Sequence, residues 1–169
     1  MKHTHTNNDL TFEKVWLMFQ ESDRKLNKIS EMYNNFAKNT GEAVEEFFFD
    51  YFERTCKIGD VEFDKIKHNV ASMDSEYDIV LTNGKYVGII ECKHKFHPDD
   101  LLKFVQDSLP KFKIEFPKYA NCKIVAGIAT YILPEKTKQL AVEHGLYIYK
   151  QSGDNVKQQN MKSFKPKYY

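Results

Sequence analysis

The sequence predicts an α/β fold in which a mixed β-sheet is flanked by helices and preceded by a long N-terminal helix. Three observations carry this prediction. Residues 12–36 have apolar side chains at alternating spacings of three and four, as in an amphipathic helix. Residues 77–93 contain two β-rich runs around an Asn-Gly turn signal. Strand-like and helix-like segments then alternate up to residue 149, which is the pattern of an α/β domain.

The first predicted element is a helix over residues 12–36 with a heptad seam. The seam positions are Phe12, Val15, Phe19, Ser22, Leu26, Ile29, Tyr33 and Phe36. A strict 3.5-residue period suits packing against another long helix, so one interpretation is a coiled coil with a second copy of the chain. The other interpretation is a helix that lies on its own domain. Asn39, Thr40 and Gly41 are expected to end this helix, which divides the chain into a helical, coiled-coil extension over 1–38 and an α/β domain over 39–169.

The remaining elements follow from the same periodicities. We expect helices over 42–56, 98–109, 111–116 and 134–144, and strands over 61–68, 77–82, 86–93, 122–129 and 146–149. Pro110 is expected to end the helix that begins at Pro98. The tail over 155–169 carries four lysines and no acid, and we expect it to be solvated rather than to contact a nucleic acid.

Composition excludes several classes of protein. The chain has 169 residues with 25 basic and 24 acidic side chains, so it is neither a polycation nor an acidic disordered segment. It has no run of eighteen apolar residues, so no membrane span is expected. The N-terminus leads into no apolar stretch, so no secretory signal is expected. Three cysteines without a Cys-x-x-Cys pair favour reduced thiols, and we therefore expect a cytoplasmic protein.

The predicted hairpin gathers charged side chains on one face. A tight turn at Asn83 and Gly84 places Asp78, Glu91 and Lys93 on the same face, because strand side chains alternate with period two. Asp78 and Glu91 are then diagonal neighbours, with Cβ atoms roughly 7 Å apart. Two carboxylates at this distance can converge on one cation.

Magnesium is the cation that suits these groups, because it takes oxygen ligands and is held by one or two carboxylates together with waters. Asp78 and Glu91 would supply the carboxylates, and the backbone carbonyl of Cys92 would be a further ligand. Lys93 would lie beside the attacking water. This chemistry suits hydrolysis of a phosphodiester.

The pattern of an acid, any residue and a lysine is not specific by itself. It occurs a second time at Asp23-x-Lys25, on the predicted N-terminal helix, where no strand surrounds it. The occurrence at Glu91-x-Lys93 is more specific, because it lies at the end of the second hairpin strand with Asp78 upstream. From the residues alone, solvated strand charges remain the competing interpretation.

Asp78, Glu91 and Lys93 match the D…(D/E)-x-K motif, and on these residues the sequence resembles the PD-(D/E)XK nuclease superfamily, whose fold is restriction-endonuclease-like. Tyr77 stands where the proline of the motif would be. More narrowly, the chain resembles uncharacterised bacterial and archaeal nuclease-like proteins with an N-terminal coiled coil. The matching segments are residues 41–46, 77–84, 90–93, 145–148 and 151–154.

The resemblance implies an endonuclease or exodeoxyribonuclease that hydrolyses DNA with Mg²⁺, for which Mn²⁺ can substitute. It implies that Asp78 and Glu91 hold the metal and that Lys93 orients the attacking water. An acid on the first core helix often joins such a site, and here that acid maps to Glu45. Helical spacing agrees, because Glu45 lies at the edge of the apolar stripe of the 42–56 helix.

Three further residues are expected at the substrate. His94 and Lys95 are expected at the rim of the site, and Gln106 on the following helix as a supporting polar group. The expected partner is DNA. No nucleotide cofactor is expected, because the sequence has neither a Walker loop nor a Rossmann glycine fingerprint.

Two alternatives stay open at this point. The first is a catalytically silent DNA-binding or assembly module that keeps the nuclease fold and dimerises through residues 12–36. The second is a dimer resembling a Holliday-junction resolvase, which is the nuclease hypothesis with a narrower substrate.

Overall fold

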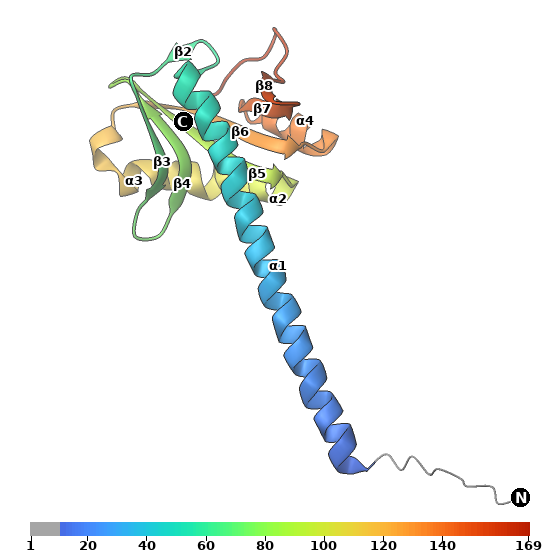
Figure 1. The fold of residues 1–169 in the computed structure, drawn as a ribbon. Coiled ribbons are helices and arrows are strands. Elements are labelled where there is room, and N and C mark those ends of the chain that lie inside the picture. The colour runs from blue at the N-terminus through green and yellow to red at the C-terminus, as the bar shows by residue number, and fades with distance from the viewer. Residues whose placement is uncertain (1–10) are drawn as a thin grey trace, which may run out of the picture. The chain divides into compact units, whose positions relative to one another are not determined.

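The computed structural model describes residues 11–169 (Figure 1). The chain divides into two compact units between Asn39 and Thr40. Helix α1 spans Phe12–Thr55, so the helix break predicted at residues 39–41 is wrong. A glycine in a helix interior costs only about 1 kcal/mol, and helical turns on both sides propagate cooperatively through such a position. None of the helices in residues 11–169 combines the length and the hydropathy needed to cross a membrane.

A six-stranded mixed sheet forms the centre of the unit Thr40–Tyr169, in the order β3-β4-β5-β6-β7-β8. Its strands are β3 (Lys65–Ala71), β4 (Glu76–Thr82), β5 (Tyr86–Lys95), β6 (Lys123–Ile132), β7 (Tyr147–Ser152) and β8 (Asn155–Gln158). β5 and β7 run parallel to β6, and the other neighbours are antiparallel. The strand predicted over 61–68 is instead divided between a small hairpin, β1 (Lys57–Ile58) and β2 (Val61–Glu62), and β3.

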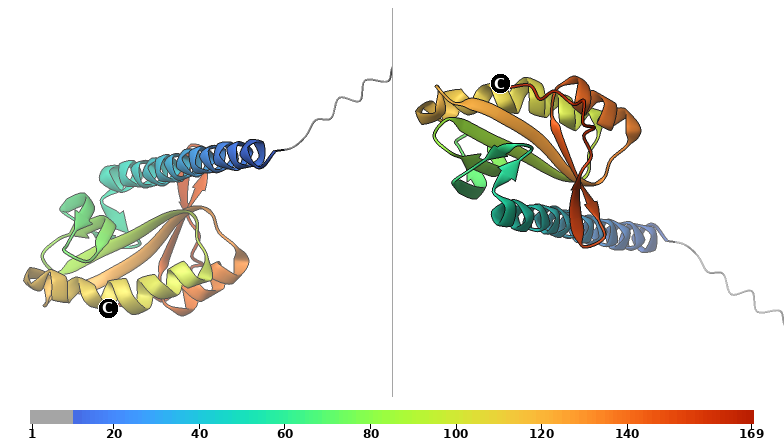
Figure 2. Two further views of the ribbon diagram at one scale, coloured as in Figure 1. Left: turned by 90° about the horizontal axis from the view of Figure 1, so that it is seen from below. Right: turned by 90° about the horizontal axis from the view of Figure 1, so that it is seen from above.

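Helices cover both faces of this sheet, as the sequence predicted (Figure 2). One face packs against α2 (Pro98–Lys103), the π-helical turn η1 (Phe104–Ser108), α3 (Leu109–Glu115) and α4 (Glu135–Glu143), and a short 3₁₀ turn, η2 (Pro117–Tyr119), follows α3. The other face packs against the C-terminal part of α1, through Val44, Phe48 and Phe52. Each face therefore has its own buried apolar cluster, and the sheet lies between them.

Pro110 does not end a helix, contrary to the prediction. It lies at the start of α3, directly after η1. The wider π-helical turn changes which backbone groups pair, and a proline is tolerated in the first turn of the helix that follows, where its missing N–H is not needed.

The C-terminal residues are not a solvated tail, which is a further correction. Tyr169 N donates to the carbonyl of Ile124 at 3.1 Å, and Ile124 N donates to the carbonyl of Tyr169 at 3.0 Å. The hydroxyl of Tyr169 donates to the carbonyl of His144 at 2.7 Å. The chain end thus packs against β6 and the end of α4. Its aromatic side chains bury a large apolar area, and the neighbouring lysines can keep their charged ends in water.

Tyr169→Ala is expected to destabilise the domain by about 2–3 kcal/mol, because it removes a hydrogen bond and an aromatic ring packed against the core. Urea unfolding measures this change. The matched control is Tyr168→Ala, because Tyr168 is 45% exposed and should cost less than about 1 kcal/mol. Equal losses in the two variants would contradict the packing described.

Candidate functional site

The β4–β5 hairpin has a wider turn than the sequence predicted. Thr82 pairs with Val87 and not with Lys85. The side-chain oxygen of Asn83 accepts hydrogen bonds from the N–H groups of Lys85 at 3.1 Å and Tyr86 at 2.7 Å. This local turn takes both residues out of the pairing with β4.

The resulting register differs from the predicted register by two residues. Because two is an even number, this shift by itself changes no side chain's face. The alternation of β4 is nevertheless interrupted at Asp78, because Tyr77 packs in the same buried cluster as Val80 while Ile79 packs in the other cluster. The β4–β5 pairing ends at Ile79–Ile90, so Asp78 and Glu91 lie just beyond the paired part of the hairpin rather than as diagonal neighbours within it.

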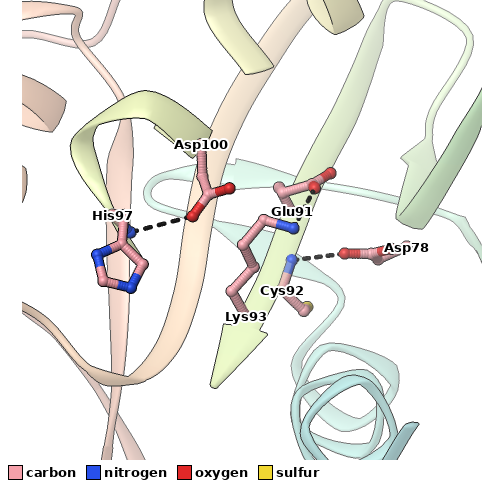
Figure 3. A network of polar contacts seen from close by, with 6 residues as sticks. All are labelled: Asp78, Glu91, Cys92, Lys93, His97 and Asp100. Carbon is pink, nitrogen blue, oxygen red and sulfur yellow. Dashed lines mark hydrogen bonds and ion pairs between the residues drawn. The ribbon is translucent and has the colours of Figure 1, made fainter. Parts of the chain in front are cut away.

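The two strands separate at these acids. The β4–β5 pairing ends at Ile79–Ile90, while β4 continues beside β3 and β5 continues beside β6. We call the gap between β4 and β5 beyond this pair the sheet split. Here Cys92 N donates to Asp78 Oδ2 at 2.6 Å, in place of a bond to the β4 backbone (Figure 3). Since the N–H and C=O of one strand residue point to the same neighbouring strand, the Cys92 carbonyl also points toward the sheet split.

Glu45 of α1 lies close to the sheet split. Its Oε2 is 3.8 Å from Nε2 of His68 on β3, and its carboxylate is within hydrogen-bonding reach of the Asn69 side chain. Asn69 has a φ of +49°, a left-handed conformation that asparagine tolerates better than most residues. Burial, together with the negative charges of Asp78 and Glu76, raises the pKa of Glu45 to about 7.

Lys93 and Glu91 form an ion pair at the sheet split, with Nζ 3.4 Å from Oε1 (Figure 3). Burial and the charge of Asp78 raise the pKa of Glu91 above its usual range. Burial alone would lower the pKa of Lys93, but the carboxylates of Glu91, Asp100 and Asp78 together raise it. The ammonium group of Lys93 is therefore charged at neutral pH.

Asp78 is also largely enclosed. Burial raises its pKa, and the N–H of Cys92 lowers it in part. The negative charge of Asp78 raises the pKa of both Glu45 and Glu91, and the negative charge of Glu45 also raises the pKa of Glu91. The structure thus gathers Asp78, Glu91, Lys93 and Glu45 into one electrostatic group, which are the four residues that the sequence singled out as catalytic.

A cleft of about 270 Å³ opens beside Glu91 and Lys93. Its lining also holds Lys103 and Lys111, which sequence reasoning missed, together with the acids Asp74, Glu76, Asp100 and Asp107. The two lysines belong to the helical stretch after Pro98 and are eight positions apart, which places them on one helix face, but no motif marks them.

The three predicted substrate residues lie outside this cleft. The ring of His94 lies edge-on to the ring of Tyr131, with 5.7 Å between the ring centroids, on the face of the sheet that α1 covers. Lys95 and Gln106 are exposed. Strand alternation explains the place of His94, because it points with Cys92 and away from Glu91 and Lys93.

The donor groups at the sheet split fit magnesium. Within residues 11–169, no three His, Cys, Asp or Glu side chains already surround a common point. Magnesium needs less, because one or two carboxylates and several waters suffice. The carboxylates of Asp78 and Glu91 and the carbonyl of Cys92 are hard oxygen donors, and a dication would favour the charged form of both carboxylates, which burial disfavours. Burial raises the pKa of the Cys92 thiol, which packs on the other face and is not a ligand.

Comparison of the chain with protein-family models, with curated proteins and with solved structures finds no match. The site therefore has to carry the functional argument, because fold alone does not imply function.

Proposed function

We propose that this chain is a Mg²⁺-dependent nuclease of the PD-(D/E)XK kind that hydrolyses phosphodiester bonds in DNA. The observation that carries the proposal is the sheet split. Two strands separate where each presents an acid, Asp78 and Glu91, and the next side chain on that face of β5 is Lys93. Charges that only keep a strand soluble would lie in solvent, whereas Asp78 and Glu91 are largely buried and their pKa values are raised.

The proposed metal ligands are Asp78, Glu91 and the carbonyl of Cys92, with Glu45 assisting from α1. When bound, Mg²⁺ or Mn²⁺ would neutralise phosphate charge and lower the pKa of the attacking water. The N–H of Cys92 fixes the orientation of Asp78, so this carboxylate is positioned before any substrate arrives.

Lys93 acts in this proposal as a cation and hydrogen-bond donor. The neighbouring carboxylates raise its pKa in the metal-free site, and as an ammonium group it can orient a water and stabilise negative charge on the phosphoryl oxygens. Lys103 and Lys111 line the same cleft and can contact neighbouring phosphates, which positions the DNA backbone without reading its sequence.

The test is a cleavage assay on linear duplex, single-stranded, nicked and branched DNA, with Mg²⁺, with Mn²⁺ and with a chelator. We expect metal-dependent cleavage of at least one form and none in the chelator. Binding of DNA without cleavage of any form, with either metal, would favour the catalytically silent module instead.

A further inference from the structure

The N-terminal part of α1 exposes an extended apolar stripe. We call its heptad positions 12, 15, 19, 22, 26, 29, 33 and 36 the α1 seam. Phe12 is 83% exposed, Leu26 62% and Tyr33 70%. Trp16 and Met32 beside the seam are also exposed. Helices gain most of their stability from packing such a stripe, and a contiguous apolar surface of this size marks an interaction site.

The chain's own domain offers no matching surface. Among the described residues from 40 to 169, the exposed large apolar side chains are Met73, Ile114, Ile132, Val142, Met161 and Tyr168. Val142 and Met161 line one pocket and Met161 and Tyr168 line another, and the other three line neither, so these side chains form no stripe as long as the seam. A helix stripe needs a continuous apolar face opposite it. The second long helix that the seam requires has to come from another molecule.

We propose that two copies of this chain pair through the α1 seam as a parallel two-stranded coiled coil, independently of any nuclease activity. The seam has large side chains at both core positions of the heptad, Phe12, Phe19, Leu26 and Tyr33 at one and Val15, Ile29 and Phe36 at the other. Since a buried aromatic covers about 150–250 Å², pairing two seams removes roughly 1,200–1,600 Å² from water. That area lies within the range of specific, stable interfaces.

Charges beside the seam favour the parallel arrangement. In a fully overlapped antiparallel pair, Lys25 would face Lys25 of the second copy and Asp23 would face Asp23 of the second copy. In a parallel pair, Lys25 faces Ser30 and Asp23 faces Met18, so no like charges meet. Charges at these flanking positions set the orientation of coiled-coil partners.

The oligomeric state of the full chain tests the pairing. Light scattering during gel filtration should give twice the chain mass of 19.9 kDa. The double variant Leu26→Glu/Tyr33→Glu places charges in the seam and should weaken pairing by at least about 100-fold, giving a monomer. The control Asn27→Glu/Asn34→Glu adds the same charges one position along, on the outer face, and should stay dimeric.

Oxidative cross-linking tests the orientation. In a parallel pair, Val15→Cys brings two thiols together across the seam, and a disulfide should form. In the antiparallel pair, residue 15 faces residue 33 of the second copy, and the two thiols would be about 27 Å apart. The wild-type chain, with its own three cysteines, is the control. A monomeric or tetrameric wild type, or a seam variant that remains dimeric, would overturn the pairing, and absence of the cross-link would overturn its orientation.

Discussion

Lys93→Ala is expected to reduce metal-dependent DNA cleavage by at least about 10²–10³-fold while the fold stays intact. Loss of one preorganised donor that stabilises transition-state charge typically costs this much. The side chain is half-buried and its interactions are with acids at the sheet split, so its removal takes away a cation and little apolar packing.

The second acid-x-lysine pattern of the chain supplies the control. Lys25→Ala changes the lysine of Asp23-x-Lys25, whose ion pair with Glu21 lies on the exposed surface of α1. It should cleave DNA at the wild-type rate. Initial rates at matched protein and Mg²⁺ concentrations measure the effect, and circular dichroism verifies the fold. A Lys93→Ala rate within threefold of wild type would remove Lys93 from the mechanism.

Glu91→Gln is expected to stabilise the metal-free chain and to abolish its stabilisation by Mg²⁺. A carboxylate with a raised pKa in the fold adds no cost at low pH, where it is protonated, and loses stability as pH rises through its folded-state pKa. The variant should therefore melt close to wild type at pH 5 and above it at pH 8. The gain at pH 8 is about 1–3 kcal/mol, or several degrees for a chain of this size.

Thermal denaturation at both pH values, with and without Mg²⁺, measures both effects. Mg²⁺ should raise the melting temperature of the wild type and leave that of Glu91→Gln unchanged, because a ligand stabilises only the state that binds it. Glu143→Gln, an exposed change on α4, is the matched control and should behave as wild type. A wild type that does not respond to Mg²⁺, or a variant that is less stable at pH 8, would contradict the proposed role of Glu91.

The candidate site was predictable where local rules decide. Period-two alternation put Glu91 and Lys93 on one face of β5, and helical spacing put Glu45 on the edge of its stripe. Alternation did not place Asp78, because the alternation of β4 is interrupted there. The turn was not predictable in detail, because the two hydrogen bonds to the Asn83 side chain, not the Asn-Gly signal, set the register. The sheet split was also beyond the sequence, because it depends on which neighbour each strand keeps beyond Ile79 and Ile90.

The fold shows the same division. The mixed sheet flanked by helices followed from periodicity and is confirmed. The errors came where tertiary packing overrides local signals. Residues 39–41 stay helical despite Gly41, a π-helical turn accommodates Pro110, and Tyr169 pairs with Ile124 although its neighbours are basic.

A crystal structure of the protein with Mn²⁺ tests the magnesium site most directly. We expect an anomalous peak at the sheet split, with carboxylate oxygens of both Asp78 and Glu91 at about 2.0–2.2 Å from the ion. Crystals grown at saturating Mn²⁺ in which the ion binds elsewhere, or in which neither carboxylate contacts it, would contradict the nuclease proposal.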